Sequence, residues 1–355
     1  MKAALNRIFK KNLLILLALL AVLAGTKYST IQARSSNFQR TQFFDEWSRA
    51  VAGMNDEEVD AFIDDLYIKL EEEEDRAYLS QLENDLHAFT SAITHQRDSR
   101  MLISFAQKLE GKLPIDSTPV NYVELLDYYA ALDDPGLLPN DPVEMYFRLQ
   151  DDSVVPVVVL FLSAVIWGVH YESEIYRYTG TTLHGRRYSS TTRAALLLIA
   201  VGVVLFNDLF DLWYSGILQS PDIWGINPMN HSRFGNYQMD LGLGGLLAVL
   251  LASKVLGALI LCHVAECIAR WKKNLKDTMI YSVMVLIALL LLGRIVKGNE
   301  WMPLLQIGMV NWYSMVAKIQ IILPLGITAL PLGLALNVLL EGTMVGLVLY
   351  ANRRK

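Results

Sequence analysis

The chain contains very little cysteine. Its 355 residues include only Cys262 and Cys267, and both lie in one apolar run. Small secreted domains often depend on disulfide bonds, but these two positions cannot cross-link a polar domain elsewhere in the chain. The sequence therefore excludes a disulfide framework, and cysteine usage gives no information about the redox compartment.

The sequence also lacks a phosphate-binding loop. No Gly-x-x-x-x-Gly-Lys-Ser/Thr pattern occurs, so we do not expect the chain to hydrolyse nucleotide, and any energy source must be a partner. No pair of catalytic residues stands at helical spacing, which disfavours an intramembrane enzyme. We therefore expect a protein that is not an enzyme, has no cofactor or metal of its own and has no nucleic-acid partner.

Long apolar runs are abundant instead. Hydrophobic residues make up 53% of the chain, which is too apolar for an ordinary soluble protein, and each run is near the roughly 20 residues that a bilayer requires. The runs lie at about 13–25, 154–169, 194–212, 241–269, 279–296 and 321–350. The sequence therefore predicts an all-α integral membrane protein with six transmembrane helices.

The first run, within residues 1–26, has two interpretations. Its length is that of a signal-peptide apolar region, and Val22 and Ala24 stand where a signal peptidase could cut. The segment is therefore either cleaved or retained as an anchor, and its basic flank predicts a cytoplasmic N-terminus in both cases.

Residues 27–152 separate the first run from the second and predict an acidic helical domain. They hold 26 acidic and 11 basic side chains, whereas the rest of the chain holds 10 acidic and 20 basic. Asn55 with Glu58 is a helix-start pattern, and apolar residues recur at helical spacing from Val59 onward. We expect this domain to be extracytoplasmic and to be followed by five further transmembrane helices in residues 153–355.

Charge between the runs supports six spans. Alternation from an inside N-terminus places the basic segments 171–193, 270–276 and 352–355 all on the cytoplasmic side, as the excess of Lys and Arg in cytoplasmic loops requires. We therefore expect a multi-pass protein of the cell membrane with both termini in the cytoplasm.

Ionisable residues inside the apolar runs are candidate functional positions, because charges at membrane depth are expensive. Lys254 and Glu341 are predicted either to pair with each other structurally or to contact substrate. Asp208 and Asp211 stand at the outer end of the third run, where interfacial hydration is the simpler explanation. His263 and Cys267, four positions apart, could share a metal ion, but one helix supplies too few ligands, and packing explains them better.

The segment Tyr171–Arg193 is short and basic and connects the second and third runs. It resembles the loop between spans two and three in permease subunits of ABC-2 type exporters, in particular the Gram-positive group with a large extracytoplasmic insertion after the first span. The matching positions are Glu172, Ser173, Ile175, Thr181, Thr182, Gly185, Arg186 and Arg193. Glu174 departs from a glycine of that pattern, and Tyr178 and Thr179 replace a leucine pair.

The resemblance extends over all six spans but not over residues 27–152. It implies a type V ABC exporter fold in a bacterial cytoplasmic membrane, with a basic helix before the first span, a coupling helix in 171–193 and short external helices before the last span. The residues that it implies at the ATPase contact are Glu172, Glu174, Thr182, Gly185, Arg186 and Arg187. The arginines either bond the ATPase or only enforce topology.

The resemblance also implies the partners. They are separate cytoplasmic ABC ATPase subunits that carry ATP and Mg²⁺, a second copy or a related permease, the lipid bilayer and an exported substrate. A peptide, a lipid-linked molecule and an ion all remain open as substrates. The alternative is a non-transporting membrane receptor or assembly protein whose acidic outer domain binds an extracytoplasmic partner.

Overall fold

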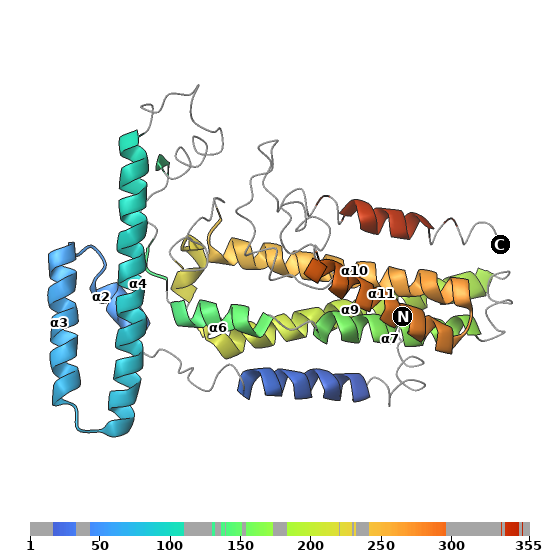
Figure 1. Ribbon diagram of the computed structural model, residues 1–355, viewed down its shortest axis with the longest axis horizontal. Coiled ribbons are helices and arrows are strands. Elements are labelled where there is room, and N and C mark those ends of the chain that lie inside the picture. Colours follow the sequence, from blue (N-terminus) through green and yellow to red (C-terminus); the bar gives the residue numbers. More distant parts are fainter. Residues whose placement is uncertain are drawn as a thin grey trace. The chain divides into compact units, whose positions relative to one another are not determined.

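The computed structural model shows a helical protein (Figure 1). It describes residues 17–32, 43–109, 130–131, 136–138, 140–150, 154–172, 183–219, 221–228, 231, 241–295, 335, 338–347 and 350. Within these ranges every regular element is a helix and no β-strand occurs. The predicted all-α class is therefore confirmed for the described part of the chain.

The chain divides into two compact units. Unit 1 comprises Met1–Ile31, Gln150–Phe210 and Val249–Lys355, and unit 2 comprises Gln32–Leu149 and Asp211–Ala248. Unit 2 thus contains most of the predicted acidic domain, together with a later segment that the sequence analysis did not group with it.

An aromatic core holds the first helices of unit 2 together. Helices α2 (Phe44–Ala50), α3 (Asp56–Glu72) and α4 (Arg76–Leu109) all contribute to it. Phe89 of α4 is completely buried, and its ring meets those of Phe44, Trp47 and Phe62 edge-on at centroid distances of 5.7–6.3 Å. Edge-to-face contacts of this kind add to the free energy gained by burying the rings.

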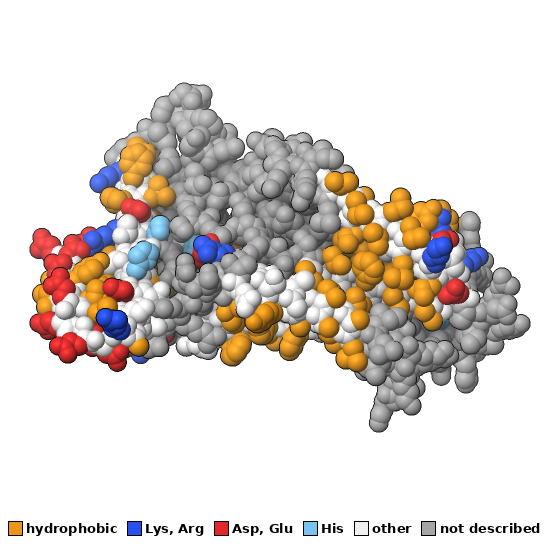
Figure 2. Space-filling model, turned by 60° about the horizontal axis from the view of Figure 1, so that its bottom comes forward, with side chains coloured by type: hydrophobic (Ala, Val, Ile, Leu, Met, Phe, Trp, Pro, Cys, Tyr) orange, Lys and Arg blue, Asp and Glu red, His pale blue; other side chains and the backbone are white. Residues whose placement is uncertain are grey.

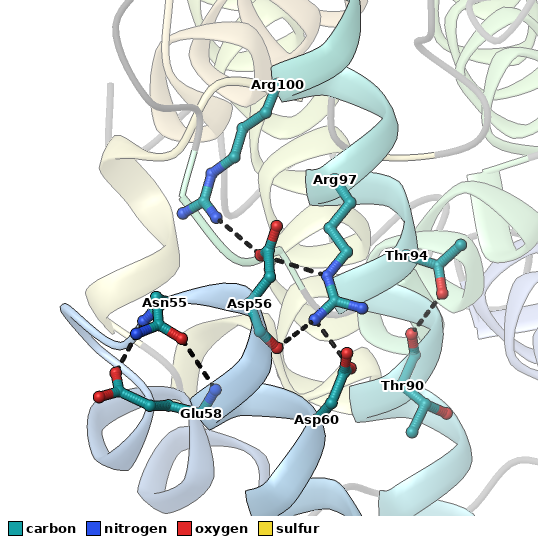
Figure 3. Close-up of polar contacts among 8 residues, drawn as sticks. All are labelled: Asn55, Asp56, Glu58, Asp60, Thr90, Thr94, Arg97 and Arg100. Carbon is teal, nitrogen blue, oxygen red and sulfur yellow. Dashed lines mark hydrogen bonds and ion pairs between the residues drawn. The ribbon is translucent and has the colours of Figure 1, made fainter.

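Helix α3 begins at the predicted position. The Asn55 side chain accepts a hydrogen bond from the Glu58 backbone N–H at 3.0 Å, and the Glu58 carboxylate accepts one from the Asn55 N–H at 2.9 Å (Figure 3). Each side chain thereby satisfies a backbone donor that has no partner inside the helix. The helix start predicted from the sequence is confirmed.

Helix α4 is one continuous helix of 34 residues. Its Asp85 is fully buried and accepts hydrogen bonds from the Phe43 N–H at 2.7 Å and from the Gln81 amide at 2.6 Å. Because Phe43 is the N-cap of α2, this carboxylate fixes the start of α2 against α4.

The later segment of unit 2 is held by close backbone contacts. Two 3₁₀ helices, η1 (Ile217–Gln219) and η2 (Pro221–Gly225), precede helix α10 (Leu243–Lys272). A Cβ atom at Gly242 would lie 2.8 Å from the Gly225 carbonyl oxygen, and one at Gly244 would lie 2.9 Å from the Trp224 ring. The absence of side chains at these glycines therefore lets η2 pack on the start of α10. Helix α6 (Asn140–Gln150) ends where unit 1 resumes.

Unit 1 contains the apolar helices. These are residues 17–32, α7 (Val154–Glu172), most of α9 (Leu183–Ser215), most of α10 and α11 (Leu275–Ile295), followed by a short apolar helix at 338–347. Their core joins Leu23, Leu160, Leu196, Leu261 and Leu286, one from each of the five long helices.

Helices α7 and α11 approach each other closely at Gly168. A Cβ atom there would lie 2.9 Å from Leu275 Cδ1 and 3.0 Å from Leu275 Cα. The glycine therefore allows the backbones to come together, as small residues do between helices in membranes.

Three described helices are long and apolar enough to cross a membrane, namely Pro142–Glu172, Ser190–Ser215 and Leu243–Lys272. They contain the predicted second, third and fourth spans and give the chain the character of a membrane protein. The predicted first span overlaps the helix at 17–32, and the predicted fifth span overlaps α11 (Leu275–Ile295). The predicted last span contains the short helix at 338–347. The six-span count stays a prediction, and the segment 296–334 lies outside the described residues.

The two units differ in surface chemistry (Figure 2). Unit 1 exposes large apolar side chains, among them Phe206 (72% exposed), Leu209 and Met284, whereas acidic side chains gather over the helices at the α3 end of unit 2. Exposed apolar surface of this kind is expected where lipid is the solvent.

Candidate functional site

A single buried carboxylate organises one end of the apolar helices. Glu266 lies on α10, is buried and follows a long apolar stretch that Lys254 and His263 interrupt. A charge in such a position is strongly destabilising unless it is paired and fully hydrogen-bonded. The surroundings of Glu266 supply these partners.

Two arginines bond Glu266 from two helices. Arg193 of α9 donates from Nε to Oε2 at 2.9 Å and from Nη2 to Oε1 at 2.5 Å, a two-point contact. Arg270, one turn along α10, donates from Nη2 to Oε1 at 2.6 Å and from Nε to the same atom at 3.2 Å. Charge-assisted bonds of this geometry are among the strongest in proteins. Two guanidinium groups therefore surround one carboxylate.

Tyr171 completes the carboxylate's contacts from a third helix. Its hydroxyl, near the end of α7, donates to Glu266 Oε1 at 3.2 Å. We refer to Tyr171, Arg193, Glu266 and Arg270 as the Glu266 cluster. The cluster thus joins α7, α9 and α10 at one point.

Aromatic rings cover the arginines of the Glu266 cluster. Trp167, one turn before Tyr171, is buried and stacks on the Tyr171 ring with centroids 5.7 Å apart. The Arg193 guanidinium lies 5.8 Å from the Trp167 ring centre, and that of Arg270 lies 5.5 Å from the Tyr171 ring centre. These cation–π contacts stabilise the charges in a poorly hydrated place.

Tyr171 and Arg193 connect the Glu266 cluster to the segment 171–193. These two residues bound the basic segment in which the sequence analysis predicted an ATPase contact, and both bond the same carboxylate of α10. Both ends of the segment are therefore bonded to one residue of α10.

The predicted contact residues themselves are only partly described. Glu172 is the last residue of α7 and is exposed beside Tyr171. Gly185, Arg186 and Arg187 lie in the first turns of α9, and nothing is described of the side chains at 183–189. Glu174 and Thr182 lie outside the described residues. Within the described part of the segment, residues 183–193 are therefore continuous with the helix of the predicted third span.

A second buried polar group lies elsewhere on the same helices. The Lys254 ammonium donates to Asp208 Oδ1 and, at 2.5 Å, to Gln150 Oε1, and the side chains of Lys254 and Asp208 are almost fully buried. The predicted pairing of Lys254 with Glu341 is therefore wrong. Asp208 lies on α9 and reaches Lys254 on α10 within hydrogen-bond distance, so the two opposite charges satisfy each other.

Glu341 has a different partner. Its Oε1 lies 2.8 Å from Nδ1 of His263, which is 3% exposed on α10. Asp208 and Asp211 are 1% and 0% exposed, so interfacial hydration, predicted for both, is also wrong, because protein covers these carboxylates. The four polar candidates therefore do not form one site.

The geometry does not place a metal ion at His263 and Cys267. Among the described residues no group of three or more His, Cys, Asp or Glu side chains is arranged to hold one. His263 is bonded to Glu341, and nearby Glu266 is bonded to the two arginines. His263, the imidazole of the considered pair, thus faces another partner.

Sequence reasoning did not single out the Glu266 cluster. A carboxylate followed four residues later by Arg270 in an apolar helix is nevertheless a detectable pattern. The contribution of Tyr171 and Arg193 depends on the packing of three helices and has no local sequence signal.

Comparisons with protein-family models, with curated proteins and with solved structures found no match for this chain.

Proposed function

We propose that this protein is the transmembrane permease subunit of an ATP-driven ABC exporter. In this role a separate cytoplasmic ATPase binds the segment 171–193, and the permease moves a substrate, such as a peptide, outward across the membrane. The observation that carries the proposal is the attachment of both ends of this segment to Glu266.

Force must enter a protein without a phosphate-binding loop through its contact with a partner. Conformational energy from ATP must arrive through a contact, and that contact must be stiff enough to tilt helices without being absorbed locally. Arg193 and Tyr171 bond Glu266 over 2.5–3.2 Å between buried groups. A displacement of the segment by the ATPase therefore moves α7, α9 and α10 together.

The charge pattern supports the orientation of this proposal. Lys272, Lys273 and Lys276, which lie at the junction of α10 and α11, stand with Arg193 at the same end of the helices as the Glu266 cluster. Under the positive-inside rule this end faces the cytoplasm, where a soluble ATPase acts. The acidic domain predicted at 27–152 is then extracytoplasmic.

The proposal is tested by the double variant Arg186→Glu with Gly185→Pro. Both positions lie in the first turn of α9, where proline removes no intrahelical hydrogen bond, so the span is expected to stay folded. We expect loss of ATPase co-purification and of ATP-dependent export from reconstituted vesicles. The control is Lys108→Glu, a charge reversal at an exposed position of α4.

Unchanged co-purification and unchanged export in the double variant would show that the segment is not the coupling contact. If the wild-type protein binds no ATPase, the receptor or assembly role becomes the better account.

A further inference from the structure

The α10–α11 junction, residues 271–277, carries positive charge that the proposed ATPase contact does not use (Figure 1). It contains three lysines, Lys272, Lys273 and Lys276, and one acid, Asp277. The Asp277 carboxylate accepts a hydrogen bond from the Asn274 amide at 2.8 Å. The acid is therefore engaged at the start of α11, and the junction has an excess of positive charge.

Two of the three lysines present their charge to the surroundings. Lys273 and Lys276 are both exposed. Within the part of the chain that the structure describes, no hydrogen bond or ion pair engages either ammonium group. Each ammonium carries three N–H donors, so together they can bind an anionic group outside the protein.

The backbone of Lys273 is strained. Its φ is 56°, and it is the one non-glycine residue of the described chain with a positive φ. Its N–H donates to the Ala269 carbonyl at 2.8 Å and closes the end of α10. Glycine is the usual residue at such a helix end, because it adopts a positive φ without steric cost. A lysine at this place therefore points to a use for its charge.

The third lysine holds an aromatic pair in place. Lys272 Nζ lies 3.5 Å from the ring centre of Trp271 and 3.8 Å from that of Tyr281. The two rings meet edge-on with centroids 5.3 Å apart. Trp271 is nevertheless 67% exposed. Tryptophan favours the boundary between hydrocarbon and headgroups, so this ring marks the headgroup level at the α10–α11 junction.

An exposed apolar face of α11 leads away from the junction. We call it the α11 face. Its members are large side chains at spacings of four, three and four residues, which keep to one side of a helix. They are Ile280, Met284, Ile287 and Leu291, which are 47%, 57%, 48% and 51% exposed. Lys276 stands four residues before Ile280 and therefore at the end of the same face.

The length of the α11 face matches one leaflet of a bilayer. Ile280 and Leu291 are about 16 Å apart along the axis at roughly 1.5 Å per residue. One leaflet supplies about half of the roughly 30 Å hydrocarbon core. An acyl chain that lies along the α11 face thus places its headgroup beside Lys276 and Lys273.

We propose that the α11 face and the α10–α11 junction bind one anionic phospholipid. Lys273 and Lys276 pair with the headgroup phosphate, Trp271 packs at the headgroup boundary, and an acyl chain lies along the α11 face. A zwitterionic lipid binds less tightly, because the lysines repel its cationic group. The site requires only that unit 1 lies in a bilayer, and it does not depend on transport or on an ATPase.

Native mass spectrometry of the full-length protein in detergent tests the proposal. The probes are dioleoyl-phosphatidylglycerol, dioleoyl-phosphatidylcholine and glycerol 3-phosphate. Phosphatidylglycerol should bind about twentyfold more tightly than phosphatidylcholine, because two lysines each contribute about fivefold near an anionic headgroup. Glycerol 3-phosphate, which has the anionic phosphate but no acyl chain, should not displace the bound lipid.

Three variants assign the preference to the two lysines. Lys273→Gly and Lys276→Gln should each lower it about fivefold, and their combination should abolish it. Lys108→Gln, at an exposed position of α4, is the matched control and should preserve it. Lys273→Gly should also keep or raise the melting temperature, because glycine relieves the strain. If the combined variant does not fold, Lys273→Gly decides alone.

A further variant separates the chain contact from the headgroup contact. Met284→Ser combined with Ile287→Ser should weaken both phospholipids and leave their ratio unchanged, because the α11 face meets the acyl chain only.

Several results would overturn the assignment. They are equal binding of the two phospholipids to the wild-type protein, or a preference for phosphatidylglycerol that survives Lys273→Gly unchanged. Displacement of the lipid by glycerol 3-phosphate would show that the lysines bind free phosphate and not a lipid.

Discussion

At the scale of single residues, a buried charge is destabilising unless it is paired, so the side chains that pair with it contribute most to stability. Glu266 is fully buried, and its carboxylate is stabilised by Arg193 and Arg270, whose side chains are 17% and 11% exposed. Removing one partner of a buried ion pair leaves the other charge uncompensated, which is far more destabilising than the loss of an exposed pair.

Glu266→Gln should therefore lower the free energy of unfolding by roughly 3–5 kcal/mol, since two guanidinium groups lose their counter-charge. The measurement is thermal or denaturant unfolding in detergent. The matched control is Asp65→Asn, which removes an ion pair with Lys69 whose side chains are 56% and 60% exposed. The control should change stability by less than about 1 kcal/mol. Equal effects of the two variants would contradict the account of the cluster.

Asp85 is the corresponding residue of unit 2. Asp85→Ala leaves the Phe43 N–H and the Gln81 amide without their acceptor and should cost roughly 1–3 kcal/mol. Asp98→Ala, at an exposed position of the same helix, should be nearly neutral. Loss of near-ultraviolet circular dichroism at lower temperature reports the difference, and a neutral Asp85→Ala would show that the start of α2 is held by other contacts.

At the scale of elements, helix contacts depend on a few small residues. Gly168 allows α7 and α11 to approach until an added Cβ would lie 2.9 Å from Leu275, whereas Gly202 of α9 has open space around it. The two glycines look alike in sequence, because both interrupt apolar helices. Only the packing distinguishes them.

Gly168→Ala should destabilise the protein by about 1–3 kcal/mol, because the new methyl group forces α11 away from α7. Gly202→Ala should be neutral or stabilising by up to about 1 kcal/mol, because alanine has the higher helix propensity and meets no atom within 4 Å. Melting temperatures of the two variants in the same detergent test this contrast. The reverse order would show that the α7–α11 approach is not tight.

The helices themselves were largely predictable from local pattern. The start of α3 at Asn55, the apolar run that became α10 and the helical character of residues 27–109 follow from capping, length and periodicity. The partner of Lys254 was not predictable, because the choice between Asp208 and Glu341 depends on how α9 and the last helix are rotated about their axes. For the same reason the sequence indicated a basic segment at 171–193 but not the carboxylate that holds its two ends.

At the scale of the whole molecule, the proposal places residue 73 of the predicted acidic domain outside the cell and the junction of α10 and α11 in the cytoplasm. We expect a Cys-less variant with Glu73→Cys to react with a membrane-impermeant maleimide in intact cells. Trp271→Cys, at a 67% exposed position in the last turn of α10, should react only after the membrane is opened. Labelling of residue 73 only after opening would overturn the proposed topology.

The central claim is that this chain receives force from a separate ATPase. The most direct measurement is purification of the complex from its native membrane in mild detergent, followed by mass-spectrometric identification of every co-purifying chain. The account predicts a stoichiometric ATPase subunit with a phosphate-binding loop, which is lost when Arg186→Glu and Gly185→Pro are combined. A protein that purifies with no ATPase subunit under conditions that keep it folded would contradict the account.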